Sequence, residues 1–178
     1  MKRAVFLDRD GVINHAEVRK GKPYPPRDVA DLRILPHVFE SLKDLSESGW
    51  LLIVVTNQPD IARGLTTHET VMRIHECLRE KLPFILEFRL CPHDDKDGCL
   101  CRKPRPGALL DAACIHGIDL TQSFMIGDRW RDIEAGNTAG CKTIFINCHY
   151  AEEQPKRYTY EAATLREAAN IILKNSCF

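Results

Sequence analysis

The sequence predicts an α/β fold, a doubly wound and mostly parallel sheet covered by helices on both faces. Two observations lead to this prediction. Short continuous apolar runs recur along the 178 residues, as in strands that are buried on both faces. Segments with the apolar spacing of amphipathic helices lie between them, and such alternation builds parallel sheets.

The first strand is expected at 4–7 (AVFL). Pro36 then opens a helix at its first turn, and Gly49 is placed to end it. The second strand is expected at 50–55 (WLLIVV), and a possible capping box of Thr66 and Glu69 begins the next helix.

The second half of the chain continues the alternation. A third strand is expected at 84–90, and a helix begins at Pro106. The remaining elements are a strand at 123–126, a strand at 142–146 and a last helix capped by Thr164 with Glu167.

Composition restricts the possible classes of protein. The length suits a single domain over residues 1–178. Lys and Arg number 25, as do Asp and Glu, so the formal net charge is zero. No basic field is available for nucleic acid, and we expect no nucleic-acid partner.

We expect a cytoplasmic protein without membrane association. The apolar run near the N-terminus has only four residues before Asp8, and no stretch approaches the roughly 20 apolar residues of a membrane span. Without an export signal, the eight cysteines favour metal ligands or free thiols over disulfides. Five of them are expected to be small, partly buried side chains: Cys77, Cys114, Cys141, Cys148 and Cys177.

Polar residues follow the predicted strands where function gathers in such sheets. Asp8 and Asp10 follow the first strand, Thr56 the second and Asp128 the fourth, while Lys103 precedes the helix that starts near Pro106. Crowded carboxylates favour Mg²⁺, and the lysine and hydroxyl favour a phosphoryl group. Each residue alone also fits a turn or a helix cap, so the signal is their order.

A second cluster lies in the loop CPHDDKDGCLCRK. Cys91, His93, Cys99 and Cys101 suit tetrahedral, structural Zn²⁺ with no open position. The alternatives are four unbound side chains or a redox-active C-x-C pair. Because Arg102 and Lys103 follow at once, we hypothesise that zinc orders a loop that delivers these two cations to a phosphate.

The chain resembles the haloacid dehalogenase-like phosphotransferases over roughly residues 1–150. The resemblance is carried by four features in order: DRDG, the Thr-Asn pair at 56–57, Lys103 and GDRWRD. The resemblance implies that Asp8 is the nucleophile and Asp10 the general acid and base. It implies that Thr56 and Lys103 steady the phosphoryl group. It also implies a Mg²⁺ site of Asp8, Asp128 and the backbone carbonyl of Asp10.

The longer motifs DRDGVIN, TNQ-x-x-IARG and C-x-H…C-x-C-RKP resemble the D-glycero-D-manno-heptose 1,7-bisphosphate phosphatases and the related histidinol-phosphate phosphatases. The resemblance implies no large cap domain but a short flap between Asp10 and Pro36, with 16–19 near the substrate. It implies substrate contacts from Asn57, Gln58 and Arg129, and the hypothesis for the zinc loop adds a substrate contact from Arg102.

We therefore expect a Mg²⁺-dependent phosphatase, active as a monomer on a small phosphorylated sugar, a heptose bisphosphate in the first place. Histidinol phosphate or a nucleotide phosphate is the alternative substrate, and a non-catalytic zinc-bearing module is the alternative class. A phosphomutase would need a cap that excludes water. The roles of three features stay open. Pro59-Asp60 departs from the loop usual in the heptose phosphatases, Trp130 could stack on a substrate or pack against the protein, and Asp132 could support an arginine or a lysine.

Overall fold

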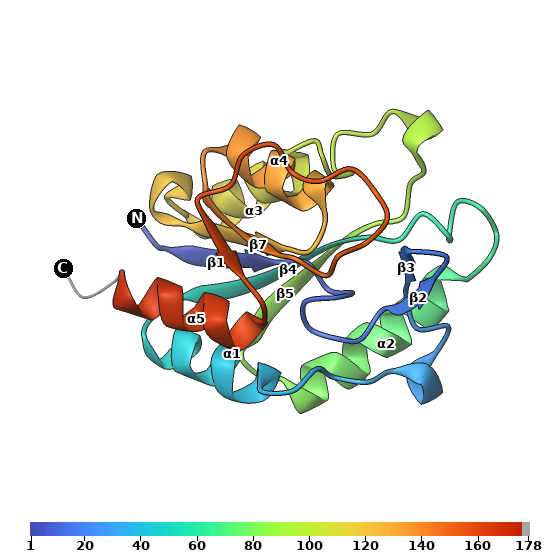
Figure 1. Cartoon of the computed structure of the whole chain (residues 1–178), viewed down its shortest axis with the longest axis horizontal. Coiled ribbons are helices and arrows are strands. Elements are labelled where there is room, and N and C mark those ends of the chain that lie inside the picture. The colour runs from blue at the N-terminus through green and yellow to red at the C-terminus, as the bar shows by residue number, and fades with distance from the viewer. Residues whose placement is uncertain (176–178) are drawn as a thin grey trace.

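The central sheet has six strands, all parallel, in the order β5-β4-β1-β6-β7-β8. The computed structural model describes residues 1–175 (Figure 1). The strands are β1 (Ala4–Leu7), β4 (Leu51–Asn57), β5 (Ile85–Cys91), β6 (Phe124–Gly127), β7 (Lys142–Ile146) and β8 (Tyr160–Ala162). The chain leaves β1 for β4 on one side and later returns to β6 on the other, so the topological switch lies at β1, where open α/β sheets bind ligands.

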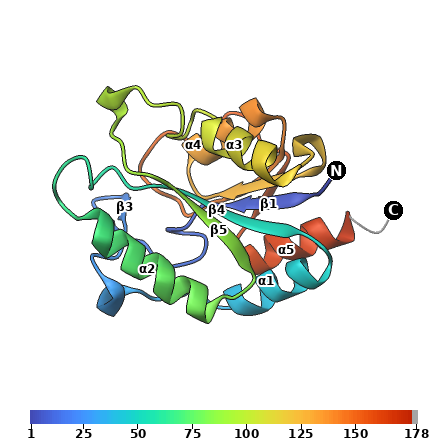
Figure 2. The ribbon, with the colours of Figure 1, turned by 180° about the vertical axis from the view of Figure 1, so that it is seen from behind.

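Helices cover both faces of this sheet, as Figures 1 and 2 show from opposite sides. Helices α1 (Val38–Glu47), α2 (His68–Lys81) and α5 (Leu165–Lys174) pack on one face. Helices α3 (Gly107–His116) and α4 (Trp130–Ala139) pack on the other. The two faces carry separate apolar cores, which confirms the predicted doubly wound fold.

The strand predictions are confirmed with small shifts. The bounds of β1 and β7 are those expected, and the other three predicted strands move by one or two residues. Among residues 1–175, no helix combines the length and apolar character that crossing a bilayer requires.

One predicted helix cap is wrong. Thr67, and not Thr66, caps α2, because its backbone is extended and its side chain accepts a hydrogen bond from the Thr70 amide. Thr66 instead closes the preceding turn by donating its amide to the Asp60 carbonyl. The cap at Thr164 is confirmed, since its hydroxyl accepts from the Glu167 amide.

Three elements were not predicted: α4, the edge strand β8, and an antiparallel hairpin of β2 (Glu17–Arg19) and β3 (Lys22–Tyr24). The hairpin forms the expected short flap. Its turn has Lys20 at φ 49° and Gly21 at φ 75°, the conformation of a tight two-residue hairpin. A glycine at the second position adopts this positive φ without steric strain.

The described cysteines outside the CPHDDKDGCLCRK loop are free thiols. Cys141 is buried, and Cys77 and Cys148 are partly buried, as expected, whereas Cys114 is exposed. Cys177 lies outside the described residues.

Candidate active site

Lys103 is the centre of a buried ion-pair cluster at the carboxyl ends of the strands. Its ammonium nitrogen lies 2.7 Å from Asp8 Oδ1 and 2.7 Å from Asp132 Oδ1, and it donates to the Val55 carbonyl at 2.6 Å. Lys103 is only 1% exposed. Burial by itself would lower the Lys103 pKa, but the charges of Asp132 and Asp8 outweigh it and raise that pKa.

Three carboxylates crowd around this lysine. Ligand oxygens of Asp8, Asp128 and Asp132 lie within 4.8 Å of one another, and all three residues are buried. Burial, with the charges of Asp132 and Asp10, raises the Asp8 pKa to about 6, although Lys103 opposes the shift. Burial and the charge of Asp8 also raise the Asp128 pKa.

Asp128 has one carboxylate oxygen with no partner. Its Oδ2 accepts a hydrogen bond from the Tyr150 hydroxyl at 2.8 Å, and its Oδ1 is buried and unpaired. A buried unpaired oxygen among like charges fits a hard cation with oxygen ligands. The donor set therefore fits Mg²⁺ held by Asp8 and Asp128.

The Asp10 carboxylate is held apart from that cluster. Arg9 donates to both of its oxygens, at 2.8 and 2.9 Å, and Asn14 and Gln58 donate at 2.9 and 2.8 Å. Arg9 is fully buried and its Nη1 lies 3.1 Å from His75 Nε2. Burial and the neighbouring Arg9 charge lower the His75 pKa to about 3, so the neutral ring accepts this hydrogen bond.

The residues after β4 connect these groups. Gln58 Nε2 also donates to Thr56 Oγ1 at 2.8 Å, so one amide bridges Thr56 and Asp10. The Asn57 amide pairs with the Lys103 backbone in both directions, at 3.0 and 3.1 Å. The side chain of Asn57 thus fixes the segment from which the Lys103 side chain projects.

A cavity of about 480 Å³ opens over Asp8 and Lys103. Four arginines on its wall are each paired with a carboxylate of the chain. The pairs are Arg63 with Asp94 and Asp60, Arg102 with Asp95, Arg131 with Asp95, and Arg129 with Glu152. An anionic ligand would meet cations that are already positioned by these carboxylates.

The flap contributes to this wall through β3 and the residues after it, 22–25. That residues 16–19 lie near the substrate stays a prediction. Ala16 and Val18 instead line a second cavity of about 410 Å³ on the other side of the hairpin. The chain reverses at Lys20 and Gly21, which turns β3 rather than β2 toward the site.

The Cys and His side chains of the loop converge as a four-ligand cluster. Cys91 Sγ lies 3.6 Å from Cys99 Sγ and 3.7 Å from His93 Nδ1, and Cys101 Sγ lies 3.6 Å from both Cys99 Sγ and His93 Nδ1. Tetrahedral zinc would separate two sulfur ligands by roughly 3.8 Å and a sulfur from a nitrogen by roughly 3.6 Å. A disulfide needs about 2.05 Å. The geometry fits zinc and excludes a disulfide.

Comparison with known proteins gives the same family as the motifs. A family model described as HAD-hydrolase-like matches residues 100–168. A curated D-glycero-beta-D-manno-heptose-1,7-bisphosphate 7-phosphatase of Helicobacter pylori is 39% identical over 149 residues, which cover 81% of this chain and 83% of the relative. A relative with the same name from Photorhabdus laumondii is 38% identical, with 76% and 75% covered. The chain belongs to the haloacid dehalogenase-like phosphatases.

A solved structure of this phosphatase family also resembles the whole chain. The crystal structure of D,D-heptose 1,7-bisphosphate phosphatase from B. bronchiseptica, complexed with magnesium and phosphate, superposes with a TM-score of 0.85. It is 29% identical and covers 98% of this chain and 99% of its own. With coverage this high, neither chain carries a large insertion that the other lacks.

The fold of this phosphatase brings most of the predicted site residues together. Asp8, Lys103 and Asp128 meet at one point, and Thr56 is linked to Asp10 through the Gln58 amide. Four residues for which we predicted substrate contacts are already engaged by the protein itself: Asn57, Gln58, Arg102 and Arg129. All four line the cavity, and their contacts with substrate stay predictions.

The structure shows the contacts of the three features whose roles the phosphatase sequence left open. Asp132 supports Lys103 and accepts from the Arg129 amide at 3.0 Å. Asp60 pairs with Arg63, which also pairs with Asp94. The Trp130 ring packs against the Arg131 guanidinium, whose carbon lies 4.7 Å from the ring centroid.

Sequence reasoning missed the residues that hold the phosphatase motifs in place. Arg9 and Asn14 sit within DRDGVIN and orient Asp10, so their proximity in sequence was a usable signal. Tyr150 and Glu152 reach Asp128 and Arg129 from a loop after β7 that carries no motif. Nothing in the sequence pointed to them.

Proposed function

We propose that this protein is a Mg²⁺-dependent phosphatase of a phosphorylated sugar, and that it removes the C7 phosphate of D-glycero-D-manno-heptose 1,7-bisphosphate. The observation that carries the reaction is the buried contact of Asp8 with Lys103 beside the unpaired oxygen of Asp128. The curated relatives, named for this substrate, support the choice over histidinol phosphate or a nucleotide.

The reaction begins at Asp8. One of its oxygens attacks phosphorus, the bond from phosphorus to the sugar oxygen breaks, and a phospho-aspartyl group forms. Asp10 gives a proton to the departing sugar oxygen. Asp10 then takes a proton from water, whose oxygen attacks the same phosphorus and releases inorganic phosphate and the Asp8 carboxylate.

The chain's own groups prepare both steps. Lys103 places an ammonium charge beside the attacking carboxylate, where negative charge spreads over the phosphoryl oxygens. Arg9, Asn14 and Gln58 keep Asp10 in one orientation. Asp8, Asp128 and the Asp10 carbonyl would hold Mg²⁺, which supplies positive charge to the phosphoryl oxygens when bound.

We propose a structural role for zinc at Cys91, His93, Cys99 and Cys101. Four protein ligands close the coordination shell, and the 3.6–3.7 Å separations suit it. The cluster lies immediately before Arg102 and Lys103. Zinc would therefore order the segment that carries both cations, because the exposed stretch between the ligands buries too little apolar surface to order itself.

The test is phosphate release from a panel of sugar bisphosphates, histidinol phosphate and nucleotides, with and without Mg²⁺. We expect Mg²⁺-dependent release from the heptose bisphosphate with the highest kcat/KM. Asp8→Asn should abolish turnover while the protein stays folded. Wild-type-like turnover by that variant would disprove the mechanism, and a higher kcat/KM for histidinol phosphate would disprove the substrate.

A further inference from the structure

The Tyr150 hydroxyl donates the one hydrogen bond recorded to the Asp128 side chain in the described part of the chain. It contacts Oδ2 at 2.8 Å, while Oδ1 is left without a partner. Asp128 is 2% exposed and Tyr150 8% exposed, so water does not readily replace this donor. One oxygen of the Asp128 carboxylate is thus bound by a fixed donor, and the other is free to bind a cation.

The backbone around Gly11 leaves the space for this contact. Gly11 has φ +89°, and a Cβ there would lie 1.9 Å from Asp128 Oδ2 and 2.9 Å from the Tyr150 hydroxyl oxygen. A side chain at this position would therefore push the two groups apart. The glycine of the DRDG motif thus lets the chain pass directly beside the hydrogen bond.

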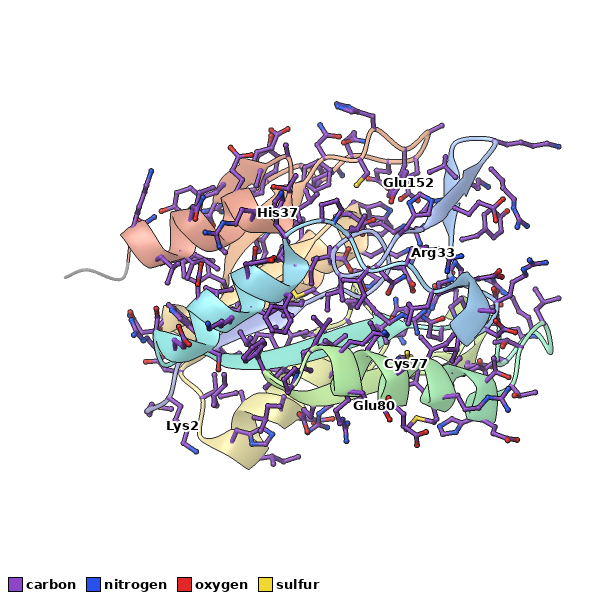
Figure 3. All side chains as sticks on the ribbon, turned by 90° about the horizontal axis from the view of Figure 1, so that it is seen from below. Lys2, Arg33, His37, Cys77, Glu80 and Glu152 are labelled. Atoms are coloured by element: carbon purple, nitrogen blue, oxygen red, sulfur yellow. The ribbon has the colours of Figure 1, made fainter. Side chains whose placement is uncertain are left out.

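The segment that carries Tyr150 is attached on both sides of the site. The Ala151 amide donates to the Gly21 carbonyl at the flap turn, at 2.8 Å. Glu152 receives two hydrogen bonds from Arg129, at 2.7 and 2.6 Å. Figure 3 shows Glu152 on the side of the molecule that carries the flap hairpin. Three consecutive residues therefore contact the carboxylate, the flap and the cavity wall.

We propose that Tyr150 is a positioning residue, which holds Asp128 so that Oδ1 faces the cation site. The inference rests on the proposed Mg²⁺ site. Without the hydroxyl, the Asp128 side chain can rotate away from Asp8, which repels it, and the ligand oxygens no longer stand ready for the ion. Binding the ion must then also fix the Asp128 side chain, so we expect at least about tenfold weaker Mg²⁺ binding, which corresponds to about 1.4 kcal/mol.

The test is Mg²⁺ binding by Tyr150→Phe in the absence of substrate. Phenylalanine keeps the ring and removes only the hydroxyl. The stabilisation of the protein against heat is measured as Mg²⁺ is added, since a ligand of the folded state raises the unfolding midpoint with its concentration. Tyr158→Phe is the matched control, because its hydroxyl also donates to a carboxylate, Glu161, but at an exposed position away from the site.

We expect the Mg²⁺ dissociation constant to rise at least about tenfold in Tyr150→Phe and to stay unchanged in Tyr158→Phe. The unfolding midpoint without Mg²⁺ reports folding separately. A constant within twofold of the wild type in Tyr150→Phe would overturn the inference. If the wild type itself gains no stability from Mg²⁺, the cation site fails and the inference fails with it, whatever the phosphatase assay shows.

Discussion

Removing the Lys103 charge should destabilise the metal-free protein far more than removing the Asp132 charge. The two variants are Lys103→Met and Asp132→Asn, and each roughly preserves the volume of the side chain. Lys103 Nζ lies 2.7 Å from one oxygen of Asp8 and one of Asp132. At an effective dielectric constant of about 20, each of these attractions amounts to about 6 kcal/mol before the cost of desolvation.

In Asp132→Asn the losses and gains nearly cancel. The variant loses one attraction of about 6 kcal/mol, but it also removes the repulsion of Asp132 with Asp8 and with Asp128, at least about 3.5 kcal/mol each because their ligand oxygens lie within 4.8 Å of one another. The asparagine oxygen can still accept from the Arg129 amide. We expect a change in the free energy of unfolding of less than about 1 kcal/mol, within the range of ordinary substitutions.

Lys103→Met has no such compensation. It removes both attractions and leaves three buried carboxylates facing one another. Removing one partner from a buried ion pair typically costs about 3–5 kcal/mol, and we expect a loss in that range. The assay is urea unfolding at neutral pH in buffer free of Mg²⁺ and of chelators, because a chelator would also remove zinc from the loop. Equal destabilisation of the two variants would refute this account of the cluster.

Two further predictions concern zinc and pH. Cys101→Ser should lose bound zinc, and its kcat/KM should fall at least about tenfold with Mg²⁺ present. The control Cys114→Ser, which changes an exposed free thiol, should match the wild type. Zinc-free protein with full turnover and affinity would contradict the proposed role of the loop. The folded-state pKa of His75 is about 3, against about 6.5 for a histidine exposed to water. The unfolded state therefore binds the proton first, and the His75 contribution to stability is complete above pH 6.5 and is lost as pH falls toward 3. Between pH 7.5 and 5.5, urea unfolding should show the wild type losing about 1 kcal/mol more than His75→Gln; equal losses would contradict a neutral buried ring.

Local sequence patterns were sufficient for five of the six strands of the central sheet, and the edge strand β8 was missed. The runs at 4–7 and 142–146 are buried on nearly every residue, so their apolar character and length identified them. Helix ends were less certain, because Thr66 and Thr67 are chemically equivalent as caps. The backbone hydrogen bond from Thr66 to the Asp60 carbonyl decided between them. The flap hairpin lacked a signal of this kind, since both of its strands are mostly exposed.

The sequence by itself determined that Asp8, Thr56 and Asp128 lie at one edge of the sheet, because parallel strands bring their carboxyl ends together whatever lies between them. Asp8 and Lys103 are 95 positions apart and still touch. Only the tertiary structure decided how each group is oriented. Asp132 turns toward Lys103, Arg9 turns toward Asp10, and Tyr150 reaches back to Asp128 from a loop fixed at the flap. Such orientations depend on contacts between segments that share no local pattern, and a periodicity of apolar residues carries no information about them.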